Sequence, residues 1–189
     1  YEIGYSRKIL EIIKKLGLKN PVYSTDPILM MHHKDTNIKG GGDYAPLHQD
    51  WRSIQGSVNC IVLWIPLVEI DTKMGSISFI EGSHLLGLLP TKKHSWFRNI
   101  NKKYLKNIKL TSIPIKKGDC FFFSSFLVHK SFENKSNRVR VSLQYRYNDL
   151  NDDHYLSRNY PTNYIHAKPK KNLKRKDVPS ISKIISTYS

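Results

Sequence analysis

The sequence predicts a single domain built on an all-β sandwich or barrel. Short runs rich in Val, Ile, Phe and Tyr recur along the 189-residue chain, and turn residues such as Gly, Asp and Asn separate them. The last run also alternates between apolar and polar side chains. The runs that we expect to form strands are 27–33, 58–67, 76–80, 109–115, 119–128 and 138–147.

An amphipathic helix precedes the strands. Residues 6–17 place four apolar side chains on one helical face, and Gly17 follows as a stop signal. The four side chains are Ile9, Ile12, Ile13 and Leu16. We expect this helix to cover one side of the β core.

The last predicted strand allows two interpretations. Between 138 and 147 the apolar side chains fall on one face and the polar side chains on the other. The polar set is Arg138, Arg140, Ser142, Gln144 and Arg146. In a surface sheet this face would contact water, whereas in a barrel with a polar cavity it would line the site.

Lysine and arginine exceed aspartate and glutamate by 16 charges, and two segments hold most of the excess. Segment 91–109 has seven basic residues and no acid, and segment 168–189 has seven basic residues and one acid. We therefore divide the chain into a domain over 1–167, with 91–109 as a basic insertion, and a basic C-terminal arm over 168–189. Such segments attract nucleic acid or anionic lipid, or they form solvated surface.

Membrane-spanning and disulfide-framework proteins are excluded. No apolar run approaches the roughly 20 residues that a membrane helix needs, and two cysteines are too few for a disulfide framework. Cys60 and Cys120 lie in apolar runs, which predicts buried free thiols in a reducing compartment. Because no signal peptide is visible, we expect a cytoplasmic protein.

The pattern that points to chemistry is His-x-Asp, which occurs at His33–Asp35 and at His48–Asp50. On an extended strand residues i and i+2 lie on the same side, so an imidazole and a carboxylate can bind one metal ion together. A histidine from a distant strand would complete a two-His-one-carboxylate face for non-haem Fe(II). His129, at the end of a long apolar run, is the candidate.

Arg140 lies eleven residues beyond His129, and the turn at 134–137 predicts a hairpin between them. From the polar face of its strand, the Arg140 guanidinium could clamp a carboxylate through two parallel hydrogen bonds. Metal ligands and an anion clamp would then share one cavity. Spacing alone also allows His48, His129 and Arg140 to be separately satisfied polar groups at strand ends.

A series of short motifs follows in a fixed order. The motifs are Pro46-Leu47-His48-Gln49-Asp50, Leu63-Trp64-Ile65-Pro66-Leu67, Gly75-Ser76-Ile77-Ser78-Phe79-Ile80-Glu81-Gly82-Ser83-His84, Lys117-Gly118-Asp119, Phe121-Phe122-Phe123, His129-Lys130-Ser131, Asn134-Lys135-Ser136 and Arg140. In order and spacing they resemble the phytanoyl-CoA dioxygenase (PhyH) family of Fe(II)/2-oxoglutarate oxygenases. Two loop positions depart from that family, because Met74 stands where Asn is usual and Glu81 stands where Pro is usual.

The resemblance implies a double-stranded β-helix, or cupin-like jelly roll, with flanking helices. It implies Fe(II), 2-oxoglutarate and O2 as cofactors, with 2-oxoglutarate converted to succinate and CO2. The implied catalytic metal ligands are His48, Asp50 and His129, and the implied cosubstrate residues are Arg140, Ser131, Trp64 and Met30. Asp50 favours hydroxylation, because the halogenases of the family replace this carboxylate with a small residue.

The residues that we expect near the substrate are Trp51, Arg52, Gln55, His33 and Arg146. This polar and basic set suits an anionic or hydroxylated small molecule, such as a sugar, a nucleotide sugar or another anionic metabolite. Packing within the loop is the equal alternative for the three that follow the metal motif. Phytanoyl-CoA itself fits poorly, because few apolar residues are available for a lipid chain.

Other function classes stay open beside this one. The basic segments could make the protein a nucleic-acid-directed oxygenase, or a non-enzymatic jelly-roll binding protein. A cupin-like metal enzyme without 2-oxoglutarate, such as an epimerase, is a third class, against which Arg140 and Ser131 argue. If the tail is only surface, deletion of 168–189 should leave turnover intact, since every candidate site residue precedes residue 150.

Overall fold

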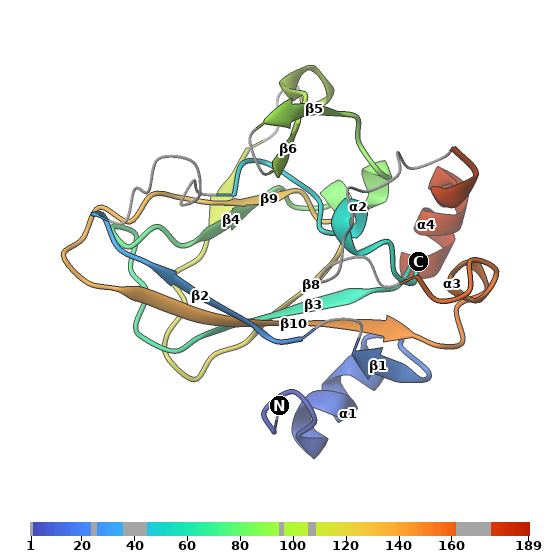
Figure 1. Ribbon diagram of the computed structural model, residues 1–189, viewed down its shortest axis with the longest axis horizontal. Helices are drawn as coiled ribbons and strands as arrows, with labels where there is room; N and C mark the ends of the chain where they lie inside the picture. Colours follow the sequence, from blue (N-terminus) through green and yellow to red (C-terminus); the bar gives the residue numbers. More distant parts are fainter. Residues whose placement is uncertain (1, 24–25, 36–44, 95–96, 106–108, 162–174) are drawn as a thin grey trace.

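The computed structural model describes residues 2–23, 26–35, 45–94, 97–105, 109–161 and 175–189 (Figure 1). Its helices are α1 (Arg7–Lys15), α2 (Trp51–Ile54), α3 (Asp153–Leu156) and α4 (Ile181–Tyr188), with 3₁₀ turns η1 (Ser83–Leu86), η2 (Lys102–Tyr104) and η3 (Arg175–Asp177). Its strands are β1 (Pro21–Tyr23), β2 (Ile28–His32), β3 (Ile61–Pro66), β4 (Ile77–Phe79), β5 (Thr91–His94), β6 (Phe97–Ile100), β7 (Thr111–Ser112), β8 (Phe121–Ser124), β9 (His129–Ser131) and β10 (Arg140–Asp149). None of these helices combines the length and apolar character that crossing a membrane requires.

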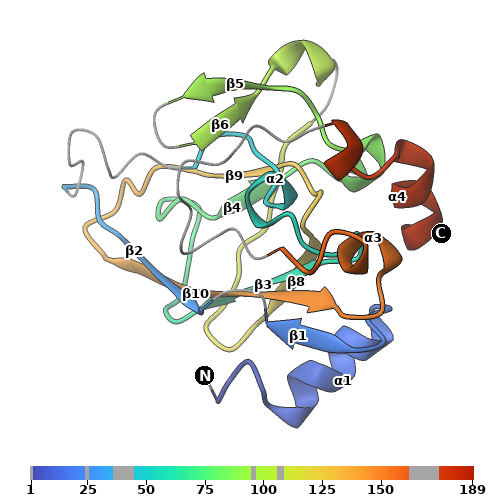
Figure 2. The same cartoon turned by 45° about the vertical axis from the view of Figure 1, so that its right-hand side comes forward.

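Two antiparallel sheets face each other. Within the described ranges, the larger sheet has the order β1-β10-β3-β8, with β2 also pairing with β10, and the smaller has the order β7-β4-β9. In Figures 1 and 2, β4 and β9 lie over the sheet formed by β3 and β10. Val62, Trp64, Ile77 and Phe123 belong to the apolar cluster between the sheets. This architecture is the predicted jelly roll.

The central strand β3 is buried along its whole length. Its odd-numbered residues pack in one cluster with Ile9 and Ile13 of α1, whereas Val62 and Trp64 join the cluster between the sheets. A strand that is covered on both faces is apolar throughout. This burial explains why 58–67 is a continuous apolar run rather than an alternating one.

Helix α1 begins at Ser6, whose hydroxyl oxygen accepts a hydrogen bond from the Ile9 backbone N–H at 3.4 Å. Ile9 and Ile13 are buried, as the amphipathic pattern predicts. Leu16 was expected on the same face, but it is 46% exposed. The helix ends one residue earlier, and Leu18 fills the core instead.

The polar face of β10 lies inside the molecule. Arg140, Ser142 and Arg146 are all at most 3% exposed. Tyr145 and Tyr147, on the opposite face, pack in the cluster with α1. Of the two interpretations of this strand, the interior one is therefore correct.

The predicted hairpin between His129 and Arg140 is wrong. Strand β8 stops at Ser124, the chain turns, and His129 opens β9 in the smaller sheet. Arg140 opens β10 in the larger sheet. The two residues therefore approach from opposite sheets, because the apolar run 119–128 contains a buried turn as well as a strand.

The basic segment 91–109 includes the β5–β6 hairpin, which projects from the body in both views, while 95–96 and 106–108 lie outside the described residues. Its base is anchored, because Ile100 is buried against Ile80, Leu89 and Val128. The Ile100 backbone N–H also donates to the Leu47 carbonyl at 2.8 Å, next to the His-x-Asp motif.

The last part of 168–189, the segment that we expect to be a basic C-terminal arm, packs on the body of the domain. Helix α4 lies beside α3 (Figure 2), and Ile184 is completely buried. Residues 168–174 lie outside the described ranges. The lysines upstream of α4 dominate the composition of 168–189. The net charge of the segment therefore does not reveal the short apolar face of the helix.

One of the two cysteines is not buried as predicted. Cys60 is buried, and burial raises the pKa of its thiol to about 12. Cys120 is exposed, because β8 begins only at Phe121 and Cys120 lies between this strand and the preceding turn. Neither forms a disulfide.

Candidate metal centre

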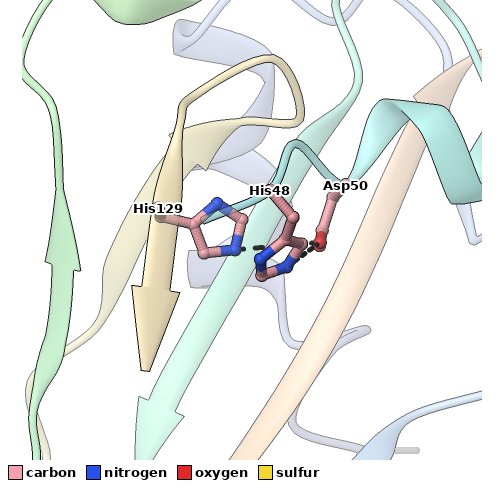
Figure 3. Close-up of side chains that lie close together, drawn as sticks. All are labelled: His48, Asp50 and His129. Carbon is pink, nitrogen blue, oxygen red and sulfur yellow. Dashed lines mark hydrogen bonds and ion pairs between the residues drawn. The ribbon is translucent and has the colours of Figure 1, made fainter. Parts of the chain in front are cut away.

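Side chains from two distant segments converge at one point (Figure 3). His48 and Asp50 lie just before α2, and His129 opens β9. The backbones of His48 and His129 exchange hydrogen bonds of 3.0 and 3.1 Å, and their ring centroids are 4.2 Å apart. One potential ligand atom from each of the three side chains lies within 4.8 Å of the other two.

The two imidazoles are oriented by the same kind of hydrogen bond. His48 Nδ1 donates to the Pro46 carbonyl at 2.7 Å, and His129 Nδ1 donates to the Leu127 carbonyl at 2.9 Å. A carbonyl oxygen only accepts, so each Nδ1 carries a proton, and each ring turns its Nε2 toward Asp50. The Nε2 atoms of His48 and His129 lie 3.1 and 3.7 Å from Asp50 Oδ1. This donor set fits Fe(II).

Asp50 is held by a buried arginine. Arg146 donates to Asp50 Oδ2 from Nε at 3.1 Å and from Nη2 at 2.9 Å, and both residues are at most 5% exposed. Burial alone would raise the pKa of Asp50, but Arg146 and the His48 hydrogen bond hold this pKa well below its usual range. The carboxylate is therefore ionised, with Oδ1 directed at the histidines. Arg146, expected near the substrate, instead binds Asp50.

His129 is in the form that a metal ion requires. Burial, followed by the neighbouring His48, lowers the pKa of His129 to about 4. The ring is therefore neutral at pH 7. The Phe123 ring contacts it edge-on, with centroids 4.9 Å apart, and excludes solvent from that side.

Sequence reasoning assigned no role to Gln49, between His48 and Asp50. Its buried amide donates to the carbonyls of Gly87 and Phe126, both at 2.7 Å. Its oxygen accepts from the Leu89 backbone N–H at 2.9 Å. A glutamine alternating with two candidate ligands must face the other way, and this alternation was the available signal.

The inner face of the larger sheet continues from Arg146 toward Arg140. Backbone pairing across β2, β10 and β3 sets neighbouring side chains in rows. In order from Arg146, the rows are Gln144 with Trp64, Ser142 with Met30, and Arg140 with His32. Trp64 and Met30, the expected cosubstrate residues, therefore lie between the metal ligands and Arg140 along this face.

Arg140 reaches from the larger sheet to the loops that flank β4 and β9 of the smaller sheet. It is 3% exposed, and its Nη1 donates to the Gly75 carbonyl and, at 3.5 Å, to the Phe132 carbonyl. Gly75 has a φ of +75°, and a Cβ there would overlap the carbonyl oxygens of Phe132 and Glu133, so this position requires glycine. Ser131 precedes Phe132 and shares one side of β9 with His129.

His32, to which the sequence analysis assigned no role, faces Arg140, whereas His33 was expected near the substrate. Burial, followed by the Arg140 charge, lowers the pKa of His32 to about 4. His33 lies beyond the end of β2, and its Nδ1 is 3.5 Å from Asp35 Oδ2, so the second His-x-Asp motif forms a local pair. The period-two alternation that places Met30 inside also places His32 inside.

The residues that follow the metal motif do not share one location. Trp51 is fully buried and stacks on Phe126, with centroids 5.2 Å apart, which favours the packing alternative over contact with the substrate. Arg52 Nη2 donates to the Leu89 carbonyl at 2.7 Å. Gln55 ends α2 in the left-handed conformation, with a φ of 54°. The helical turn of α2 starts at Trp51 and directs the Trp51 side chain away from the ligand cluster.

Comparison with known proteins identifies relatives of the chain. A sequence model of the phytanoyl-CoA dioxygenase (PhyH) family matches residues 7–142. Methylphosphonate hydroxylase of Gimesia maris is 31% identical over 136 residues, which is 68% of this chain and 51% of that protein. The peroxisomal phytanoyl-CoA dioxygenase of Bos taurus is 29% identical over 119 residues, which is 59% of this chain and 35% of that protein. The chain thus spans about half or less of the length of these relatives.

Solved structures share the fold. EctD from S. alaskensis, crystallised with 2-oxoglutarate and 5-hydroxyectoine, superposes with a TM-score of 0.61 at 16% identity, covering 80% of this chain and 52% of that one. The non-heme alpha-ketoglutarate-dependent epimerase SnoN from nogalamycin biosynthesis gives a TM-score of 0.60 at 20% identity, covering 78% of this chain and 57% of that one. At these identities the likeness establishes the jelly-roll architecture.

Proposed function

The chain belongs to the phytanoyl-CoA dioxygenase family, and from this membership we propose that it is an Fe(II)/2-oxoglutarate-dependent oxygenase that hydroxylates a small, polar, anionic molecule. One observation carries the proposal. One nitrogen from each of two imidazoles and one carboxylate oxygen, whose partner oxygen is held by Arg146, converge within a distance that one metal ion can bridge. His48, Asp50 and His129 would hold the iron.

The inner face of β10 supports a cosubstrate site beside that iron. Arg140 would bind the far carboxylate of 2-oxoglutarate, with Ser131 adding a hydrogen bond. Trp64 and Met30 would line the space between, since they occupy the rows between the metal ligands and Arg140. His32, neutral beside Arg140, is a further polar group at this end.

The protein would contribute binding, orientation and exclusion of water. Fe(II), when bound, supplies the activation of O2 that oxidises 2-oxoglutarate to succinate and CO2 and hydroxylates the substrate. Arg146 keeps Asp50 ionised and turns Oδ1 toward the histidines. The carbonyls of Pro46 and Leu127 hold the two rings in the orientation that turns Nε2 toward Asp50.

Two observations support an anionic substrate. Several relatives are named for anionic compounds, namely methylphosphonate, phytanoyl-CoA and 1-deoxypentalenic acid. The chain carries a net charge of +16, which favours the approach of anions. Arg146 was expected among the basic residues near the substrate, but it binds Asp50. The proposed substrate class therefore rests on the names of the relatives and on the net charge.

The test begins with binding. Mn(II), an inert substitute for Fe(II), should bind wild type, and 2-oxoglutarate should then bind the loaded protein far more tightly than the metal-free protein. Asp50→Ala should abolish both, as measured by calorimetry. With Fe(II) and O2, succinate should form faster in the presence of methylphosphonate or another small anion than without it. Metal binding without 2-oxoglutarate binding would instead favour a cupin-like enzyme of another class.

A further inference from the structure

The C-terminal helix covers the back of the turn that carries Asp50. Helix α4 places Ile184 in a cluster with Trp51, Val58 and Phe126, and all four are completely buried. Trp51 directly follows Asp50 in the chain. Figures 1 and 2 show α4 on the α2 side of the molecule, beside α3. The metal-bearing turn is therefore packed from behind by the end of the chain.

A chain of hydrogen bonds joins α4 to the segment before His129. The Tyr188 hydroxyl donates to the Val58 carbonyl at 3.0 Å, so the Ser124 hydroxyl must donate to Tyr188 across their 2.6 Å contact. Ser124 Oγ in turn accepts from the Phe126 N–H at 3.1 Å. Such chains reinforce one another in a buried setting.

The same segment is bonded to the metal-bearing turn. The Trp51 backbone N–H donates to the Ser125 carbonyl at 2.9 Å, and the Gln49 amide donates to the Phe126 carbonyl at 2.7 Å. Residues 124–128 lead directly into His129. Helix α4 thus contacts both segments that supply candidate metal ligands.

Trp51 is enclosed from its other side as well. The Arg158 guanidinium lies 5.3 Å from its ring centroid, and Arg158 Nη2 donates to the Gly56 carbonyl at 2.7 Å. The indole N–H is 3.2 Å from the carbonyls of Gly56 and Ser57. Arg158 and these carbonyls thus contact Trp51 in addition to the cluster that contains Ile184.

We propose that α4 is a brace for the metal centre, in which Ile184 and Tyr188 are positioning residues that hold the Asp50 turn and the 124–128 segment at the spacing that metal binding requires. Ligand atoms must be held within about 0.5 Å of their working geometry. A gap at Ile184 would let Trp51, and with it Asp50, shift relative to His129. This inference rests on the proposed function for the use of the metal, but its test requires only that the metal binds.

The experiment compares two isoleucines on one helix. Ile184→Ala removes the buried contact, and Ile185→Ala makes the same change at a residue that is 44% exposed. Mn(II) affinity is measured by calorimetry well below the melting temperature of each variant, so that only folded protein is compared. We expect at least a tenfold loss of affinity for Ile184→Ala and no change for Ile185→Ala. Equal affinities would overturn the brace, even if Ile184→Ala melts earlier.

Tyr188→Phe provides a milder second test if Ile184→Ala does not fold. It keeps the ring and removes the hydroxyl that links Val58 to Ser124. We expect a several-fold loss of Mn(II) affinity together with a changed near-ultraviolet signal from Trp51, and an unchanged affinity would count against the proposal. Wild type that binds Mn(II) but never oxidises 2-oxoglutarate would refute the proposed function and leave the brace standing.

Discussion

Two arginines lie six residues apart on the same face of β10, yet they do different work. Arg146 donates twice to the buried carboxylate of Asp50, so its charge is balanced by a candidate metal ligand. Arg140 donates to the backbone carbonyls of Gly75 and Phe132. The comparison teaches that one alternating strand can supply both an internal support and a recognition group. The tertiary partner of each arginine decides its role.

The largest effect is expected from substitution of Arg146, which binds Asp50. Arg146→Gln leaves the Asp50 carboxylate buried without its cation, which typically costs about 3–5 kcal/mol. We expect a matching loss in the free energy of unfolding, measured by urea denaturation, and loss of tight Mn(II) binding. Arg138→Gln is the control, because the Arg138–Asp71 pair is about half exposed and should cost at most about 1 kcal/mol. Similar losses in the two variants would contradict the distinction.

Arg140→Lys should weaken the binding of 2-oxoglutarate without affecting the binding of the metal. An ammonium group cannot supply the planar fork that binds a carboxylate through two parallel bonds. We expect 2-oxoglutarate affinity of the Mn(II)-loaded protein to fall at least about tenfold, with Mn(II) affinity unchanged. Calorimetry in sequence, metal first and then 2-oxoglutarate, separates the two. An Arg140→Lys protein that loses Mn(II) affinity and keeps 2-oxoglutarate affinity would contradict the role given to Arg140.

The smallest effect concerns the pH dependence of stability at the Arg140 end. Folding holds the pKa of His32 at about 4, below its usual 6.5, so below pH 6.5 the unfolded chain binds more protons than the folded one. The unfolding free energy should therefore fall as pH drops from 6.5 toward 4. His32→Leu should make this slope shallower by up to one proton, or about 1.4 kcal/mol per pH unit. Urea denaturation between pH 7 and 5 measures the slope, with His33→Leu as the matched control. A slope that is unchanged in His32→Leu would show that His32 is not held neutral by the fold.

Local patterns predicted the candidate ligands more reliably than their surroundings. His48 and Asp50 share a side because they are two apart in extended chain. His129 was found from its position after an apolar run, although it opens a new strand in the other sheet. A run of apolar residues does not show where a strand ends, because a buried turn is apolar as well.

Trp51 illustrates what such patterns miss. Its place beside Asp50 suggested contact with substrate, but Trp51 opens the short helix α2 and packs in the core instead. The α4 helix, far away in sequence, fills the space behind it. Composition described 168–189 as basic, whereas the packing of Ile184 depends on which surface that helix meets.

The all-β class, the amphipathic helix and the His-x-Asp pair could be predicted from the sequence, since each depends on residues that are close together along the chain. Three features depend on the tertiary fold: which arginine binds the Asp50 carboxylate, which histidine faces Arg140 and what covers Trp51. These outcomes depend on contacts between residues about 100 or more positions apart, such as Arg146 with Asp50 and Ile184 with Trp51. Burial and charge pairing depend on which distant segments contact each other, and the spacing of residues within one segment does not specify that contact.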